Sequence, residues 1–211
     1  MKEYSCYIKR GLTDRISREL IINGDYITFK DKTLAKDTFT TFFKSEITDC
    51  RFGIHWLRLR LVFGTQYRII IRNNENKILK ITFKSYFRYR LNELHQQYCD
   101  ILEALWVLHF RDITMSYIKK YENNEEFSIC DVHFKNDGIT LKTDVFLKEQ
   151  ATFIPWEKIR TKSYYSNFSI YSEEDPANIN RGYNYMEDWN VNVLFSALRG
   201  ILSAKNIETY D

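Results

Sequence analysis

The hydrophobic positions up to Ser85 mostly alternate with polar ones, as in β-strands that bury one face. The clearest run is 57–61, where three leucines alternate with Arg58 and Arg60. Turn-forming residues separate the alternating runs, so the pattern predicts an antiparallel meander of seven short strands. We expect these strands at 16–22, 25–30, 39–43, 47–54, 57–61, 67–72 and 77–83.

The first two predicted strands are joined by Asn23-Gly24. A type I′ turn requires positive φ at both central residues, which asparagine and glycine adopt more readily than other residues. The sequence therefore predicts a β-hairpin with a two-residue turn at this point.

After Ser85 the hydrophobic residues recur every three or four positions, which is the period of an α-helix. They are Leu91, Leu94, Tyr98, Ile101, Leu102, Leu105, Leu108, Ile113 and Tyr117. This pattern predicts a long amphipathic helix at about 85–121. A helix of roughly 30 residues is about 45 Å long. We therefore expect its first half to close one β-rich module and its second half to lead into the next.

The second half of the chain repeats this order of elements. A hairpin is predicted around the turn 136–138, strands are predicted near 153–165 and 168–171, and a closing helix is predicted at about 187–204. Residues 27–30 match 139–142, and an isoleucine follows twenty residues after the start of each segment, at Ile47 and Ile159. We therefore predict two tandem modules, 1–121 and 122–211.

The segment Ile154-Pro155-Trp156-Glu157-Lys158-Ile159, followed by a strand at Ile170-Tyr171, is similar to bacterial PH-like domains. Seven strands and one closing helix likewise resemble the pleckstrin-homology superfold. The resemblance implies an α+β, mostly antiparallel fold of two PH-like β-sandwich or barrel modules, each followed by a C-terminal amphipathic helix. An acidic, Asn-rich stretch after Tyr171 replaces two expected strands, which predicts an abbreviated second module or an irregular edge. Inositide binding is not implied, because Ser45-Glu46 follows Lys44 where that version of the family has a basic pair.

The composition is that of a folded domain rather than a disordered chain, with 44% hydrophobic and 16% aromatic residues. No apolar segment resembling a secretory signal follows Met1, so we expect a soluble, cytoplasmic protein. The four cysteines, Cys6, Cys50, Cys99 and Cys130, are widely spaced. We expect them to be reduced thiols.

Charge is distributed unevenly along the chain. Residues 51–90 contain ten basic residues and one acid, whereas the chain from Glu122 onward contains fifteen acids and nine bases. Strand alternation suggests a basic sheet face as the candidate binding site, made of Arg58, Arg60, Arg68, Arg72 and Lys80. Such a face would bind an acidic partner. The alternative is a solvated face neutralised by the acidic second half of the chain.

Other kinds of site have less support. The run 86–90 has a composition that suits nucleic acid, but we expect its aromatics to complete a core, so nucleic acid is not expected as a partner. His95/Cys99 and Cys130/His133 have spacings that occur in zinc sites, yet neither pair belongs to a double Cys-x-x-Cys pattern. No metal, cofactor or catalytic residue is predicted.

The sequence is thus most consistent with a non-enzymatic interaction module whose basic face meets an acidic protein surface or a second copy of the chain. Peripheral binding to anionic lipid head groups through the same face is the main alternative. A small hydrolase with residues assembled only in space is the third.

Overall fold

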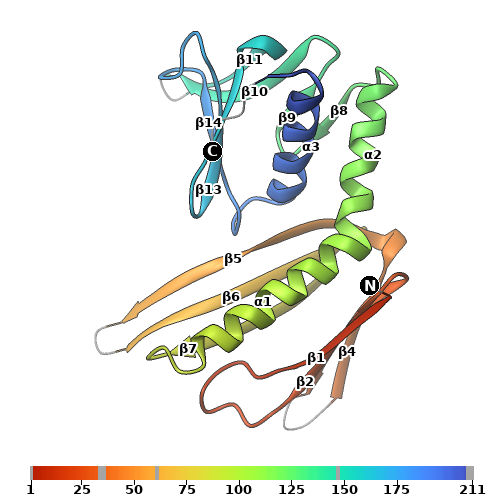
Figure 1. The fold of residues 1–211 in the computed structure, drawn as a ribbon, viewed down its shortest axis with the longest axis vertical. Coiled ribbons are helices and arrows are strands. Elements are labelled where there is room, and N and C mark those ends of the chain that lie inside the picture. The colour runs from red at the N-terminus through yellow and green to blue at the C-terminus, as the bar shows by residue number, and fades with distance from the viewer. Residues whose placement is uncertain (1, 33–36, 60–61, 146–147, 208–211) are drawn as a thin grey trace. The chain divides into compact units, whose positions relative to one another are not determined.

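The computed structural model describes residues 2–32, 37–59, 62–145 and 148–207. Contacts divide the chain into two compact units, residues 1–111 and 112–211 (Figure 1). The fold is α+β, as predicted, with antiparallel strands in four sheets. Each sheet is open and has two edge strands, so the described strands do not form the closed barrel that was one of the expected forms.

The first unit contains a four-stranded sheet, a three-stranded sheet and a helix. The four-stranded sheet has the order β1 (Glu3–Ile8), β2 (Arg18–Asn23), β3 (Tyr26–Lys32) and β4 (Asp37–Phe43). A 3₁₀ turn, η1 (Lys44–Glu46), leads to β5 (Ile47–Leu59), β6 (Val62–Asn73) and β7 (Ile78–Tyr86). Hence seven strands precede the helix, although two of them differ from those expected.

The strand boundaries differ at β1 and β5. Residues 3–8 form β1, which the sequence pattern did not predict, and pair with β2 along their whole length. The two strands predicted at 47–54 and 57–61 are one strand, β5, up to Leu59, and residues 60–61 lie outside the described part of the chain. β5 continues because β6 offers backbone partners from Asn73 to Val62.

The β2–β3 hairpin is confirmed, but its turn is not the predicted type I′ turn. Neither Asn23 nor Gly24 has positive φ. The side-chain oxygen of Asn23 instead accepts hydrogen bonds from the backbone amides of Asp25 and Tyr26, both at 3.0 Å. An asparagine side chain can therefore close this turn without left-handed backbone.

The predicted long helix is present from Leu91 rather than from 85. It consists of α1 (Leu91–Leu105), a π-helical turn η2 (Trp106–Phe110) and α2 (Arg111–Glu122). The preceding residues Phe87, Arg88 and Arg90 all have positive φ, which excludes them from a right-handed helix.

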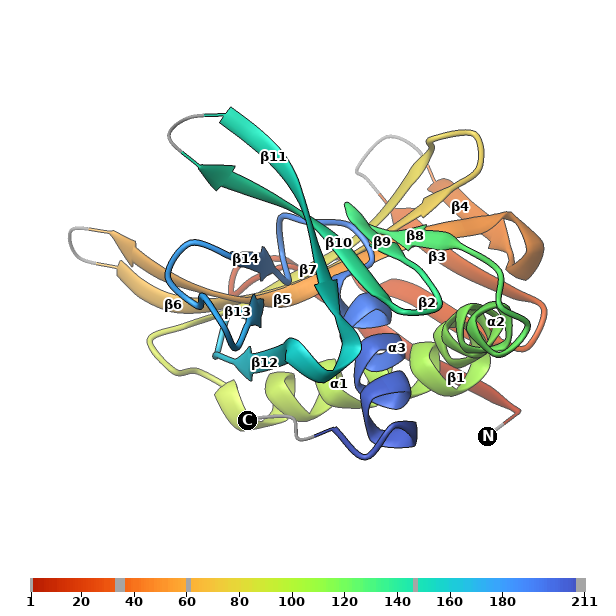
Figure 2. The ribbon, with the colours of Figure 1, turned by 90° about the horizontal axis from the view of Figure 1, so that it is seen from above.

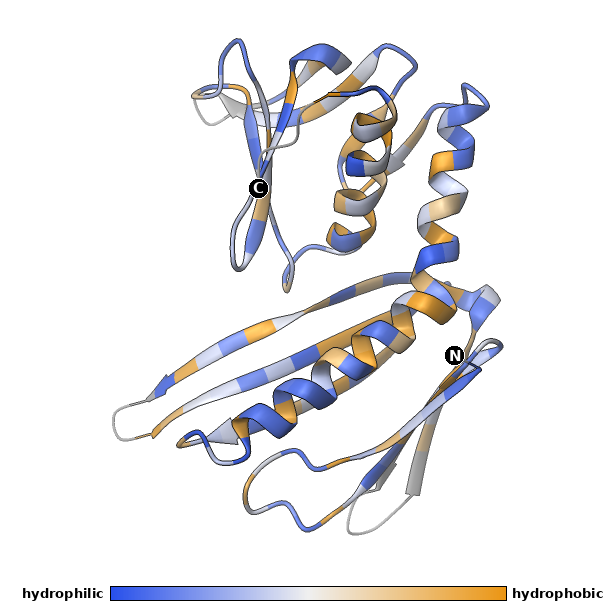
Figure 3. Cartoon of the chain, viewed as in Figure 1, coloured by the Kyte–Doolittle hydropathy of each residue, from blue (hydrophilic) through white to orange (hydrophobic). Residues whose placement is uncertain are grey.

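The core of the first unit lies between its sheets and α1. The buried face of α1 carries Tyr98, Ile101, Ala104 and Leu105, and hydrophobic residues recur along the helix in Figure 3. Tyr67 of β6 contacts both Tyr98 and Phe83, with ring centroids 5.1 Å apart in each pair. Helix α1 therefore covers the face of the β5–β6–β7 sheet that bears Tyr67, and we call the opposite face of this sheet the outer face.

The second unit has the same order of elements after α2. Its four-stranded sheet contains β8 (Phe127–Ile129), β9 (Val132–Phe134), β10 (Gly138–Val145) and β11 (Lys148–Pro155), and β8 to β10 run side by side in Figure 2. A 3₁₀ turn, η3 (Trp156–Lys158), leads to β12 (Ile159–Ser163), β13 (Asn167–Ser172), β14 (Asn180–Asn184) and α3 (Val191–Ala204). The stretch after Tyr171 thus contains one strand, β14.

Helix α2 packs into the second unit, whereas the sequence-based division at 121/122 assigned it to the first module. Tyr117 contacts Phe127 at 5.4 Å between ring centroids, and Tyr121 contacts Trp156 at 5.3 Å. These contacts explain why the division falls at 111/112. No helix in the described part of the chain is long and apolar enough to cross a membrane.

Candidate binding groove

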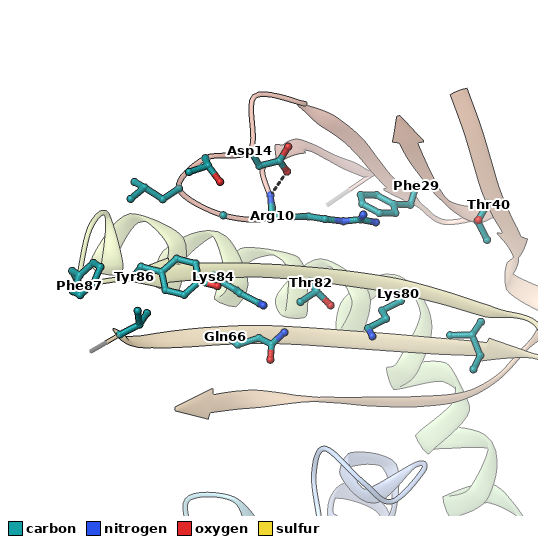
Figure 4. A pocket seen from close by; sticks show the side chains of 15 residues that line it. Arg10, Asp14, Phe29, Thr40, Gln66, Lys80, Thr82, Lys84, Tyr86 and Phe87 are labelled. Carbon is teal, nitrogen blue, oxygen red and sulfur yellow. Dashed lines mark hydrogen bonds between the residues drawn. The ribbon is translucent and has the colours of Figure 1, made fainter. Parts of the chain in front are cut away.

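A groove of about 960 Å³ lies in the first unit, between the β1–β2 loop and the outer face of the three-stranded sheet (Figure 4). One wall is the loop segment 10–14. The other wall is β7, which contributes five alternate side chains, and two inward-facing residues of the four-stranded sheet, Phe29 and Thr40, line it too. The β7 side chains are Ile78, Lys80, Thr82, Lys84 and Tyr86.

The alternation along β7 explains why these five side chains share the groove. Successive residues of a strand point to opposite faces. Leu79, Ile81 and Phe83 are buried in the core, so the even-numbered residues face outward. Residues paired across β6 and β7 lie on the same face, which adds Gln66 opposite Lys84 to the groove.

Three cations and one carboxylate line the groove. In Figure 4 Arg10 extends from the loop towards Phe29, and Lys80 and Lys84 lie along β7. Among the described residues no carboxylate forms an ion pair with Lys80 or Lys84. The groove therefore presents positive charge between apolar surfaces.

The carboxylate, Asp14, holds the loop rather than neutralising the lysines. It accepts hydrogen bonds from the backbone amides of Arg10 at 2.7 Å and Ile16 at 3.0 Å. It also forms an ion pair at 2.5 Å with Arg18, whose side chain is only 5% exposed. Burial alone would raise the pKa of Asp14, but these hydrogen bonds and the Arg18 charge together lower it. Asp14 therefore stays ionised and fixes the loop wall.

The structure brings together three residues of the predicted basic face. Arg68, Arg72 and Lys80 all lie on the outer face, but only Lys80 lines the groove. Arg72 pairs with Asp49 of β5 at 2.9 Å, which supplies the counter-charge expected for a basic sheet face. Sequence reasoning missed Arg10 and Lys84, and Lys84 could have been found by strand alternation from Lys80.

Arg58 does not belong to this face. It pairs with Phe63 of β6, an odd-numbered position, and so lies on the face opposite Arg68 and Lys80. Arg60 lies outside the described residues. The candidate site predicted from the sequence is therefore divided between two faces of the sheet.

Around Arg58 is a second surface, the aromatic–arginine surface, made of Trp56, Arg58, Phe63, Phe87 and Arg88. A cavity of about 410 Å³ is lined by four of these residues, and Phe87 contacts Phe63 edge to face at 5.2 Å. The three aromatic side chains are each more than half exposed. The expectation that the aromatics of 86–90 complete a core is therefore wrong for Phe87, and also for Tyr89, which is 58% exposed.

The candidate zinc pairs form no larger cluster. Cys99 Sγ lies 3.8 Å from His95 Nε2 on α1. Cys130 instead donates to the carbonyl oxygen of Trp189, and His133 contacts Ser128 and Glu126. Within the described ranges, no three His, Cys, Asp or Glu side chains lie close enough to hold a metal ion.

Ser128, His133 and Glu126 form a hydrogen-bonded chain on the β8–β9 hairpin. Ser128 Oγ lies 3.1 Å from His133 Nδ1, and His133 Nε2 lies 3.0 Å from Glu126 Oε2. A hydrolytic triad also needs donors for the oxyanion and a cavity for the substrate. Ser128 and Glu126 are exposed, and the cavities described above are lined by residues of the first unit. The chain of hydrogen bonds thus supports no catalytic assignment.

Comparison with protein-family models and with curated proteins finds no match to this chain. Functional inference therefore depends on the groove and the aromatic–arginine surface themselves.

Proposed function

We propose that this chain is a non-enzymatic interaction protein that binds an acidic segment of a protein partner in the groove of its first unit. The observation that supports this most is the pair Lys80 and Lys84, whose positive charges face a groove with apolar walls. A cleft lined by one sign of charge attracts ligands of the opposite sign. The partner is another protein or a second copy of this chain, whose second unit contains more acidic than basic residues.

We also propose that the two units are tandem PH-like modules. This is supported by the common order of a four-stranded sheet, a 3₁₀ turn, a three-stranded sheet and a helix in each unit. The segments matched by sequence occupy corresponding strands, with 27–30 in β3 and 139–142 in β10. Ile47 and Ile159 each begin the strand after a 3₁₀ turn.

Charge reversal at the groove tests the main proposal. A fluorescent polyglutamate peptide should bind the wild-type protein in an anisotropy titration at low salt, and the double variant Lys80→Glu/Lys84→Glu should bind it at least about tenfold more weakly. Lys119→Glu/Lys162→Glu, at two exposed lysines of the second unit, makes the same change in net charge, is the matched control and should leave the affinity unchanged. Equal binding by the wild type and the double variant would contradict the proposal.

Peripheral binding to anionic lipid is a second candidate, favoured by the aromatic–arginine surface. Exposed tryptophan and phenylalanine side chains beside arginines are suited to the interface between lipid head groups and acyl chains. Trp56 is 55% exposed, and Arg58 and Arg88 form no ion pair with the described residues.

Sedimentation with neutral and anionic vesicles at low and physiological salt tests the lipid candidate. Binding to anionic vesicles alone, lost in Trp56→Ala and in Arg88→Glu but kept in Lys80→Glu/Lys84→Glu, would assign lipid binding to the aromatic–arginine surface. Absence of sedimentation with either vesicle would remove this candidate.

A further inference from the structure

Strand β7 has two properties that bear on the backbone conformation of the bound segment. It is the outermost strand of its sheet, and among the described strands it pairs only with β6. The outer side of an edge strand carries backbone amides and carbonyls that can pair with an added strand. The same strand supplies five alternate side chains to the groove. A ligand in the groove therefore lies beside a backbone that can extend the sheet.

The spacing of the two lysines sets which pattern of carboxylates an extended ligand must carry. Lys80 and Lys84 are four residues apart in a strand, so their α-carbons are about 13 Å apart. Four residues of an α-helix advance only about 6 Å. Two carboxylates four residues apart match both lysines only when the segment that carries them is extended.

Thr82, which lies between the two lysines on the same face of β7, places a further requirement on the ligand. Its hydroxyl oxygen is buried and has no hydrogen-bond partner among the residues that the structure describes. A buried polar group without a partner is costly, so a ligand gains affinity where a rotamer change of Thr82 brings this hydroxyl within reach of a hydrogen-bonding group on the ligand. Ile78 and Tyr86, one at each end of the groove, offer apolar surface.

We propose that the acidic segment lies along β7 as a fourth strand of the β5–β6–β7 sheet. Cross-strand neighbours share a face, so the segment would have two carboxylates four residues apart, opposite Lys80 and Lys84. A polar residue between them lies opposite Thr82, and apolar residues two positions further out lie opposite Ile78 and Tyr86. This inference rests on the proposed function, because it specifies the conformation and pattern of the acidic ligand.

The loop wall, residues 10–14, would cover only one side of the added strand. Loop residues 10–14 face the outer face of β7 across the groove. They would therefore cover the side chains that the added strand directs to the same side as Lys80 and Lys84. Asp14, which ties the loop to Arg18, keeps this wall in place without the ligand.

A nine-residue peptide provides the test on the full-length protein. Glutamates stand at its third and seventh residues, threonine at its fifth, leucines at both ends and alanines elsewhere. Two permutations of the same composition have the glutamates three or five residues apart, which puts the second carboxylate on the opposite face of a strand. Anisotropy titrations should show binding of the first peptide about tenfold tighter than either permutation.

Charge exchange tests whether Lys80 and Lys84 pair with the third and seventh residues of the peptide. Lys80→Glu/Lys84→Glu should lose the glutamate peptide and gain a peptide with lysines at the third and seventh residues, whereas Lys119→Glu/Lys162→Glu should behave as wild type. Recovery by charge exchange shows that the double variant is folded. Failure of the lysine peptide to bind a folded double variant would overturn the assigned pairing.

Backbone methylation of the peptide tests the added strand itself. Only alternate amides of the peptide can donate to β7. N-methylation of one alternate set should abolish binding, and N-methylation of the other set should leave it nearly unchanged. Equal effects of both sets, or equal binding of all three glutamate spacings, would overturn this inference while leaving the proposed function intact. Failure of both the peptides and polyglutamate to bind would overturn the two together.

Discussion

Asp14 shows how a single carboxylate prepares the groove for an acidic ligand. A carboxylate beside Lys80 and Lys84 would compete with such a ligand, but the charge of Asp14 is directed to Arg18 and to two loop amides. Removing one member of a buried ion pair leaves the other charge uncompensated, which is strongly destabilising. The loop wall and the stability of the first unit thus depend on the same residue.

Asp14→Asn should lower the free energy of unfolding by about 2 kcal/mol at neutral pH, because charged hydrogen bonds are lost. Glu174→Gln, whose carboxylate pairs with Lys158 at the surface at 3.2 Å, should lower it by less than about 0.5 kcal/mol. Urea denaturation at one pH measures both. Equal effects of the two substitutions would contradict the role assigned to Asp14.

The difference in unfolding free energy between wild type and Asp14→Asn should also depend on pH. The pKa of Asp14 in the folded protein lies below its ordinary value of 3.8. The stabilising effect of the carboxylate is therefore complete above that value and is lost as the pH falls through the lower, folded-state pKa. Denaturation series from neutral pH to about pH 2 should show a constant difference that shrinks at the acid end. A difference that grows as the pH falls would contradict this.

At the scale of secondary structure, periodicity identified most elements but not their limits. The helix period beyond Leu91 is obvious in the sequence, but its beginning depends on the left-handed conformations of Phe87, Arg88 and Arg90, which composition does not reveal. The division of β5 into two predicted strands was wrong because β5 pairs with β6 without interruption from Asp49 to Leu59. Strand β1 was missed although Tyr4, Cys6 and Ile8 alternate with exposed residues along it, and it pairs with β2 over its whole length.

Alanine substitutions at two glycines should change the free energy of unfolding by different amounts, because Gly24 lies in an open turn and Gly138 in a tightly packed strand. Gly24→Ala should change the free energy of unfolding by no more than about 0.5 kcal/mol, because φ is not positive there and a Cβ would meet no atom within 4 Å. Gly138→Ala should cost about 1–3 kcal/mol, because its Cβ would overlap the carbonyl oxygen of Ile154. Thermal or urea unfolding measures both changes. A cost of about 1–2 kcal/mol at Gly24 would indicate the left-handed turn predicted from the sequence.

At the scale of the whole molecule, the two units carry opposite net charge. Residues 1–111 contain 20 basic and 12 acidic residues, and residues 112–211 contain 11 basic and 16 acidic residues. This asymmetry could be read directly from the sequence, as could Lys80. The groove could not, because Arg10 and Asp14 are far from β7 along the chain and meet it only through tertiary structure.

Binding of an acidic ligand should therefore be sensitive to salt. Raising the salt concentration from about 0.1 M to 1 M shortens the Debye length from about 10 Å to 3 Å. The affinity of the wild-type protein for the glutamate peptide should fall several-fold over this range in anisotropy titrations. Affinity that is independent of salt would indicate that apolar contacts dominate binding, against the role assigned to Lys80 and Lys84.

Amide hydrogen exchange of the full-length protein, with and without the glutamate peptide, tests most directly where an acidic segment binds. We predict that the peptide slows exchange in β7, residues 78–86, and in the loop wall, residues 10–14. Slower exchange confined to 56–63 and 87–90, or to the second unit, would contradict the assignment of binding to the groove.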